Sequence, residues 1–193
     1  IHETLNGQNN PKTALPSSYT TTFNLQKDYP LSTTSCPPHI KRCCPKKDPM
    51  DVWGNKRNPM IAICSGVTSR KIAPDLLHTN HLALFQYLLP SLMRTYDCDI
   101  DYLITIGFDK GDSFYDNAAG QKETLAWMEM NIAKPLAEAG IKVEFLFVEV
   151  DNTLMKPGPV FNAMLLEAYE AGADYFYRLN EDSELRSYDP NVD

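Results

Sequence analysis

The residues best suited to chemistry lie near the C-terminal end, where Asn180, Glu181, Asp182 and Glu184 follow an apolar run. Side chains alternate along an extended chain, so Asn180, Asp182 and Glu184 would share one face. Grouped oxygen ligands suit a hard cation such as Mn²⁺ or Mg²⁺. Such a cation could neutralise a diphosphate leaving group and act as a Lewis acid. A solvated acidic turn is the other interpretation of these residues.

A second polar segment, SGVTSR at residues 65–70, also follows an apolar run. It has neither the GxGxxG pattern of dinucleotide-binding folds nor the GxxxxGK[ST] pattern of P-loops. Its backbone N–H groups, the hydroxyls of Ser65, Thr68 and Ser69, and the guanidinium of Arg70 could hold the uracil, ribose or phosphate of a nucleotide. An ordinary loop between a strand and a helix is the alternative.

Two more segments carry groups that suit a nucleotide. Asp109 follows a third apolar run and could accept hydrogen bonds from a base or ribose, although DKGD is also typical of a turn. Lys156 and Asn162 flank PGPVF, whose prolines stiffen the start of a helix. Lys156 would then lie near a helix N-terminus, which favours phosphate. An exposed lysine without a ligand is the alternative.

Each of these polar segments follows an apolar run that would position it. The four runs lie at residues 60–64, 102–108, 143–150 and 174–179. Unbroken apolar runs of this length predict strands that are buried on both faces and therefore parallel.

Helical patterns, with apolar residues three or four positions apart, separate the predicted strands. They span residues 77–92, 125–136 and 161–168. Pro90 must kink or end the first helix, whereas Gly140 and Gly172 would cap the C-termini of the other two. This order predicts an α/β fold, a Rossmann-like and mostly parallel sheet with flanking helices. Ligands bind such sheets beyond the carboxyl ends of the strands, where the four polar segments would meet.

Residues 1–58 differ in composition from residues 59–193. They contain 7 of the 14 prolines and no sustained periodicity, which predicts an irregular Pro/Cys-rich arm or linker before a domain at residues 59–193. The arm holds 8 Lys/Arg and 4 Asp/Glu, whereas the domain holds 10 and 21. The acidic domain argues against nucleic acid as the main partner. No apolar run is long enough for a transmembrane segment.

The five cysteines are an odd number, so at least one thiol is unpaired in a monomer. Cys36, Cys43 and Cys44 lie in the arm and could bind zinc together with His39, although their spacing matches no standard zinc module. A disulfide formed in a secretory compartment is the favoured alternative. Cys64 lies in an apolar run and is expected to be a buried, inert thiol.

The motifs together resemble a GT-A type glycosyltransferase domain with a DxD motif. The matching pieces are, in order, PMIAICSGVTSR, DYLITIGFDKGDSFYDN and KPGPVFNAMLLEAYEAGADYFYRLNEDSEL, within residues 59–185. The chain is similar in particular to predicted glycosyltransferases of algae, protists and large DNA viruses. The resemblance implies transfer of a sugar from a nucleotide-sugar, a UDP-sugar above all, with Mn²⁺ or Mg²⁺. The acceptor would be a glycan or a protein.

The resemblance also implies roles for individual residues. Ser65, Thr68, Arg70 and Asp109 would contact the nucleotide, and Lys156 and Asn162 would lie near the ribose and diphosphate. Asn180-Glu181-Asp182 would take the place of the DxD triplet, with Asp182 the direct metal ligand and Glu181 a second candidate. The family pattern has Asp where this sequence has Asn180, a departure that bears on metal affinity.

In this family the acceptor site and the catalytic base follow the DxD strand, and only eight residues follow Leu185. We therefore expect a nucleotide-sugar-binding half, truncated at its C-terminus, and nominate no catalytic base. A non-catalytic GT-A-like binding module and a sugar-1-phosphate nucleotidyltransferase are the alternatives. The family and the clustered cysteines predict the secretory pathway, with the Golgi lumen as the compartment. A cytoplasmic or viral location is the other possibility.

Overall fold

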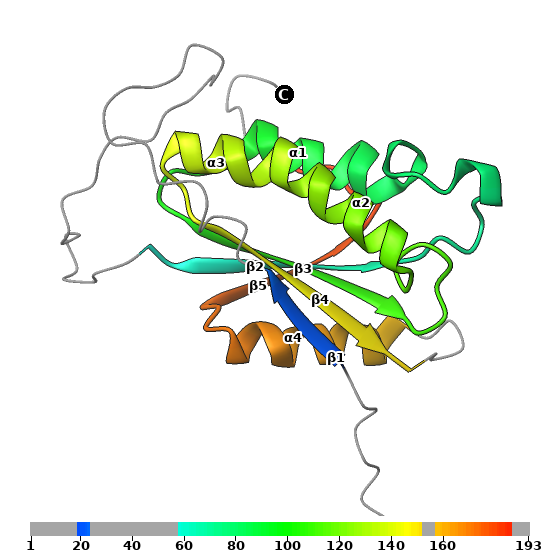
Figure 1. Ribbon diagram of the computed structural model, residues 1–193. Helices are drawn as coiled ribbons and strands as arrows, with labels where there is room; N and C mark the ends of the chain where they lie inside the picture. Colours follow the sequence, from blue (N-terminus) through cyan, green and yellow to red (C-terminus); the bar gives the residue numbers. More distant parts are fainter. Residues whose placement is uncertain (1–18, 24–57, 152–156, 187–193) are drawn as a thin grey trace, which may run out of the picture.

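Figure 1 shows the computed structural model of the protein, which describes residues 19–23, 58–151 and 157–186. A five-stranded sheet forms its middle layer, in the order β1-β4-β3-β2-β5. The strands are β1 (Tyr19–Phe23), β2 (Met60–Val67), β3 (Asp101–Asp109), β4 (Val143–Val150) and β5 (Tyr175–Asn180).

The four strands predicted from the apolar runs are present as β2 to β5, and they pair in parallel. The predicted α/β class with a mostly parallel sheet is thereby confirmed. From β2 the chain adds β3 and then β4 on one side, and β5 returns to the other side of β2. The direction of strand addition reverses between β2 and β5, which is where open α/β sheets bind ligands.

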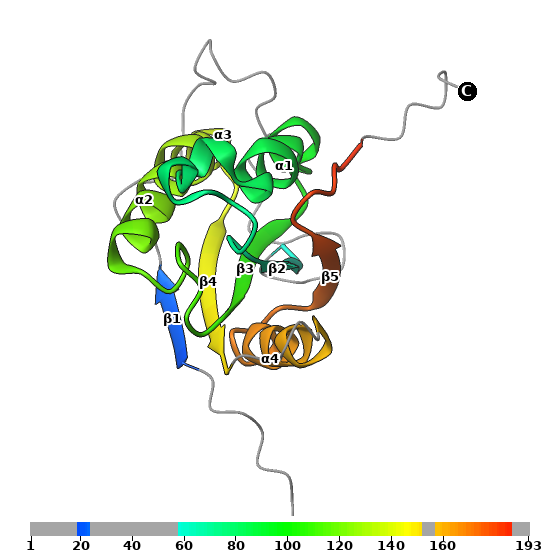
Figure 2. The same cartoon turned by 90° about the vertical axis from the view of Figure 1, so that its right-hand side faces the viewer.

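Helices cover both faces of the sheet (Figures 1 and 2). One face carries α1 (Leu89–Thr95), α2 (Ala118–Met128) and α3 (Lys134–Ala139), and the other carries α4 (Pro157–Glu170). The shorter segments are two 3₁₀ turns, η2 (Pro74–Leu76) and η3 (Thr79–His81), and two π-helical segments, η4 (Leu84–Leu88) and η5 (Glu129–Ala133).

Prolines change the type of helix rather than end it. Pro90 lies in the first turn of α1, directly after η4, and Pro135 has the same place in α3, after η5. Proline has no N–H to donate, so the regular ladder of hydrogen bonds is broken at both points. Gly140 and Gly172 adopt positive φ angles of 87° and 89° just past α3 and α4, as predicted for C-caps.

Alternating side chains build two apolar cores, one on each face of the sheet. In β4, Phe145 and Phe147 pack on the side of α1, α2 and α3, whereas Leu146 and Val148 pack on the side of α4. The same alternation holds in β2 and β3, whose side chains are almost all buried. The prediction that the apolar runs are buried on both faces is confirmed for these three strands.

The fourth run does not have the predicted burial. In β5, Tyr175, Phe176 and Tyr177 are 59%, 38% and 56% exposed. The strand ends the sheet and pairs with β2 alone among the described strands, so both of its faces are only partly covered. An apolar run predicts a strand, but it does not distinguish a central strand from an edge strand.

One strand comes from the segment that we expected to be an irregular arm. Tyr19–Phe23 forms β1, which pairs antiparallel with β4 from Tyr19↔Glu149 to Phe23↔Phe145. Its sequence, YTTTF, is rich in the β-branched residues that favour strands, but it lacks an apolar run. Residues 1–18 and 24–57 lie outside the described residues, and so does the zinc site considered at Cys36, His39, Cys43 and Cys44.

The described cysteines are of two kinds. Cys64 is a free and fully buried thiol, and burial raises its pKa to about 11, with a smaller opposing effect from Thr105. The prediction that Cys64 is buried is therefore confirmed, and the raised pKa disfavours the reactive thiolate form. Cys98 is disulfide-bonded.

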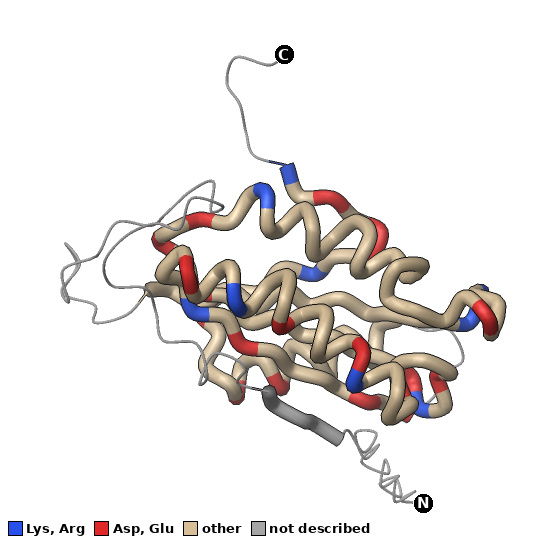
Figure 3. Tube along the Cα trace, turned by 45° about the horizontal axis from the view of Figure 1, so that its top comes forward, with Lys and Arg blue, Asp and Glu red and all other residues tan. Residues whose placement is uncertain are grey.

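Along the described part of the chain, acidic and basic residues are interspersed rather than gathered into one basic stripe (Figure 3). None of the described helices has the length and apolar character needed to span a bilayer.

The helical glycines Gly120 and Gly158 provide a test of the packing. A Cβ atom at Gly120 would lie 2.1 Å from the carbonyl oxygen of Phe114, whereas one at Gly158 would meet no atom within 4 Å. We expect Gly120→Ala to lower the free energy of unfolding by about 1–3 kcal/mol through overpacking. Gly158→Ala should be neutral or stabilising, by up to about 1 kcal/mol. Urea unfolding of both variants checks this, and equal effects would contradict the packing.

Candidate functional site

A cavity of about 340 Å³ opens at the carboxyl edge of the sheet, on the face that α4 covers. Its walls come from the ends of β2, β3 and β5, the loop after β2, and the first turns of α4. The lining residues are Gly66, Val67, Thr68, Arg70, Lys71, Gly107, Phe108, Asp109, Pro157, Val160, Phe161 and Asn180. The cavity therefore lies at the reversal point of the strand order.

Two glycines on adjacent strands make room for α4 beside this cavity. Gly66 and Gly107 are direct partners in the β2–β3 register. A Cβ at Gly107 would come within 2.6 Å of Met164 Sδ and 2.7 Å of Val160 Cγ1, so α4 packs directly on the β3 backbone. At Gly66 the nearest atom would be in Phe161, at 3.6 Å.

Phe161 forms an aromatic wall of the cavity. The guanidinium of Arg178, on β5, lies 3.9 Å from the centroid of the Phe161 ring. This cation–π contact fixes the plane of the ring between β5 and the first turns of α4. Phe161 appeared in the sequence only as part of the apolar stripe of a predicted helix, and nothing in its spacing indicated a place in a site.

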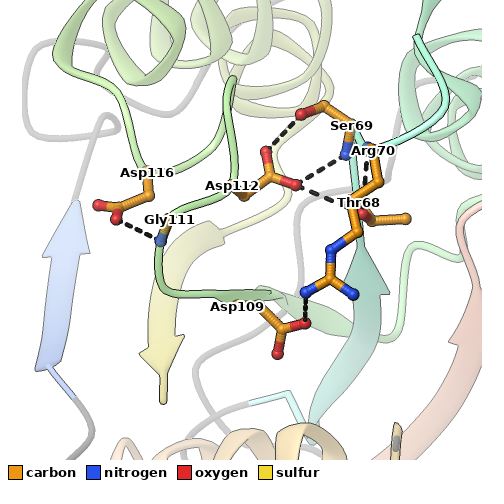
Figure 4. A network of polar contacts seen from close by, with 7 residues as sticks. All are labelled: Thr68, Ser69, Arg70, Asp109, Gly111, Asp112 and Asp116. Carbon is orange, nitrogen blue, oxygen red and sulfur yellow. Dashed lines mark hydrogen bonds and ion pairs between the residues drawn. The ribbon is translucent and has the colours of Figure 1, made fainter. Parts of the chain in front are cut away.

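Arg70 and Asp109 form an ion pair at the cavity, with Nη2 of Arg70 2.6 Å from Oδ2 of Asp109 (Figure 4). The loop after β2 provides the arginine and the end of β3 provides the carboxylate. The side chain of Asp109 is only 16% exposed and that of Arg70 is 37% exposed. Two residues that were predicted to contact a nucleotide thus contact each other in this structure.

Asp112 holds the two loops together, and the sequence analysis missed it. It accepts hydrogen bonds from Ser69 N (2.8 Å) and Ser69 Oγ (2.7 Å) across the gap between the loops. It also accepts from Phe114 N (3.0 Å) and Tyr115 N (2.9 Å), and more weakly from Thr68 Oγ1 (3.4 Å). Figure 4 shows the carboxylate facing the residues of the loop after β2.

Hydrogen bonding keeps the Asp112 carboxyl group ionised despite its burial. Burial alone raises the pKa of this group, but donors from Ser69, Tyr115 and Phe114 outweigh that effect and lower it below 3.8. Acceptance of the N–H groups two and three residues further along the chain is the geometry of an Asx turn. The signal for it in the sequence is an aspartate within the turn-prone segment DKGDS. Asp116 has a similar local role and accepts from Gly111 N at 2.7 Å.

The three residues of the predicted DxD-like triplet have different surroundings. Asn180 lines the cavity, and Asp182 is exposed beyond the end of β5. Glu181 is half-buried and accepts a hydrogen bond from Thr68 N at 3.4 Å, so its side chain contacts the loop after β2. Among the described residues, no three His, Cys, Asp or Glu side chains come close enough to hold a metal ion together.

Two other predicted site residues, Ser65 and Asn162, are described by the structure but do not line the cavity. Ser65 is 2% exposed on the opposite face of β2, and its Oγ has no hydrogen-bond partner among the described residues. Asn162 is exposed on α4, one position past the lining residue Phe161. Lys156 lies outside the described residues. The structure therefore brings together Thr68, Arg70, Asp109 and Asn180.

Comparisons with known proteins found no relative of this chain. The chain matches no protein-family model, and searches of curated proteins and of solved structures found no match either.

We expect Asp112→Asn to destabilise the protein by about 1–3 kcal/mol, because an amide cannot accept all of the buried N–H and O–H groups that the carboxylate accepts. Asp116→Asn is the matched control, since the amide oxygen can still accept from Gly111 N, and its cost should be below about 1 kcal/mol. Chemical unfolding of the two variants measures both values. Similar small losses in both would show that Asp112 does not hold the loops.

The pH dependence of stability tests the environment of Glu181. Burial, with added repulsion from Asp182 and Asp112, raises its pKa from 4.5 to about 7, against a smaller opposing effect of Thr68 N–H. Between these pH values the unfolded chain releases a proton that the folded chain keeps, so this group lowers stability as pH rises from about 4.5 to about 7. The variant Glu181→Gln has no ionisable group at this position, so it does not lose this part of its stability as pH rises.

The melting temperature of Glu181→Gln relative to wild type should therefore rise between pH 4.5 and pH 7 and stay constant above. Thermal denaturation followed by circular dichroism at a series of pH values provides the measurement. A difference that does not change with pH would mean that the Glu181 carboxyl group is solvated like an ordinary surface glutamate.

Proposed function

We propose that this chain binds a nucleotide-sugar, a UDP-sugar above all, as the donor in the reaction of a metal-dependent glycosyltransferase. Such an enzyme transfers the sugar to a glycan or protein acceptor. One observation carries the proposal: four predicted donor-contacting residues from three separate parts of the sequence meet at one cavity. They are Thr68, Arg70, Asp109 and Asn180. The cavity lies where open α/β sheets hold nucleotide ligands.

The lining of the cavity suits a nucleoside. Phe161, Val160 and the two glycines give an apolar surface against which a planar base can pack. Asp109 can accept hydrogen bonds from N–H or hydroxyl groups, and Arg70 can donate to a carbonyl or phosphate oxygen. A few polar groups on an apolar wall are the usual composition of a small-molecule site.

We propose that a divalent cation would be held here by the protein together with the bound donor. Mg²⁺ is commonly held by one or two carboxylates together with substrate phosphates rather than by a complete protein cage. Asp182 would supply the carboxylate and Asn180 an amide oxygen at the edge of the cavity. When bound, Mn²⁺ or Mg²⁺ would neutralise the charge of the diphosphate. Lys156, before α4, remains a further candidate phosphate contact.

Thermal stability with nucleotides tests the proposal. UDP or a UDP-sugar with Mn²⁺ at about 100-fold its dissociation constant should stabilise the chain by about 2.7 kcal/mol, a clear rise in melting temperature. Asp182→Asn should remove the part of this rise that depends on Mn²⁺. Glu170→Gln, which neutralises an exposed carboxylate at the far end of α4, is the control and should leave the response intact.

No shift with UDP, GDP or their sugars in the presence of Mn²⁺ would rule out donor binding. A shift that Asp182→Asn leaves unchanged would rule out the metal site. The alternative function, a non-catalytic binding module with the same fold, predicts the first outcome and no effect of Asp182→Asn. Two contacts support that alternative. Arg70 and Asp109 pair with each other rather than with a donor, and Glu181 accepts a hydrogen bond from Thr68 N rather than facing a cation.

We also propose a compartment, the secretory pathway and the Golgi lumen in particular. The disulfide at Cys98 supports an oxidising compartment, because disulfides are rare in reducing ones.

A further inference from the structure

The loop after β2 donates three successive backbone N–H groups within the protein. Thr68 N donates to Glu181 Oε2 at 3.4 Å, and Ser69 N donates to Asp112 Oδ2 at 2.8 Å. Arg70 N donates to Thr68 Oγ1 at 3.3 Å. Each of these three N–H groups therefore has an acceptor within the protein, with the short and buried bond at Ser69.

Glu181 is turned toward the side of the loop where Asp112 lies. Thr68 contacts both carboxylates, since its N–H donates to Glu181 Oε2 and its Oγ1 donates to Asp112 Oδ2, each at 3.4 Å. Neither Glu181, Asp112 nor Tyr115 is among the residues that line the cavity, whereas Asn180, directly before Glu181, is.

We infer that Glu181 is a positioning residue, which holds the loop carrying Thr68 and Arg70 against the end of β5, rather than a ligand of the metal ion. The β2–β5 register ends at Gly66↔Asn180. The Glu181 side chain continues the connection between the two strands for two more residues of β2 and its loop, through the N–H of Thr68.

The loop is then fixed from both neighbouring strands. Asp112, after β3, holds Ser69, and Glu181, after β5, holds Thr68. Arg70 follows directly and places its guanidinium on Asp109 at the cavity. Glu181 would act on the ligand through the position of this loop, without touching the ligand or the cation.

Two substitutions separate the positioning role from metal binding. Glu181→Gln keeps the length of the side chain and an oxygen that can accept from Thr68 N, but it removes the charge. Glu181→Asp keeps the charge, but its side chain is one methylene shorter and cannot reach the same N–H. A positioning residue tolerates Gln and not Asp, whereas a metal ligand, which needs the charge, tolerates Asp better than Gln. Asp182→Asn serves as the reference for loss of the metal.

The first measurement uses the full chain without ligand. Amide hydrogen exchange by NMR should show Thr68 N–H protected equally in wild type and Glu181→Gln, and exchanging at least about tenfold faster in Glu181→Asp, because local opening sets the exchange rate. Equal protection of Thr68 in wild type and Glu181→Asp would overturn the inference. This outcome does not depend on any nucleotide.

The second measurement rests on the proposed function and uses UDP as the probe, by calorimetry with and without Mn²⁺. Glu181→Gln should bind UDP within about threefold of wild type and keep its response to Mn²⁺, whereas Glu181→Asp should bind UDP about tenfold more weakly even without Mn²⁺. Loss of the Mn²⁺ response in Glu181→Gln, as in Asp182→Asn, would make Glu181 a metal ligand and overturn the inference. Failure of wild type to bind UDP would contradict the proposed function alone, and the exchange rates would still decide the role of Glu181.

Discussion

The candidate site depends on one buried carboxylate, that of Asp112. Ionised and almost fully buried, it is stable only because several donors from two loops converge on it. Those donors fix the loop after β2 relative to the loop after β3, and this fixed loop brings Arg70 to Asp109. The buried carboxylate of Asp112 thus connects two loops, because its partner Ser69 lies 43 residues earlier in the sequence. Without it, the loop after β2 would lose its buried connection to the loop after β3 and keep the ion pair of Arg70 with Asp109 and the contact of Thr68 with Glu181.

A second constraint, the absence of side chains at Gly66 and Gly107, shapes the cavity itself. Because the two glycines are partners across β2 and β3, they form a shallow strip on the sheet where α4 can approach closely. Val160 and Met164 fill the strip at Gly107, and Phe161 stands over Gly66. The cavity lies beyond this contact, between the first turns of α4 and the strand ends. The packing of α4 on these glycines therefore also places the α4 residues that line the cavity.

The fold followed closely from the sequence where local pattern and tertiary environment agree. The runs that became β2, β3 and β4 are unbroken because each strand is covered on both faces, and the period of the intervening helices reflects one buried stripe each. The prediction was wrong about burial at β5, where the same kind of run lies at the edge of the sheet. It also missed β1, because a threonine-rich strand has little apolar signal. In both places the neighbouring strand decides the outcome, and no local pattern records it.

For the site, the sequence by itself determined which polar segments follow which strands, and therefore that Thr68, Arg70, Asp109 and Asn180 would gather at one edge. Chain order and the parallel arrangement are enough for that conclusion, since all parallel strands end at the same edge. Only the tertiary structure decided where each side chain points. It turned Ser65 to the opposite face, paired Arg70 with Asp109, and directed Glu181 to the N–H of Thr68. The physical reason is that orientation beyond the end of a strand depends on hydrogen bonds to other loops, which are distant in sequence.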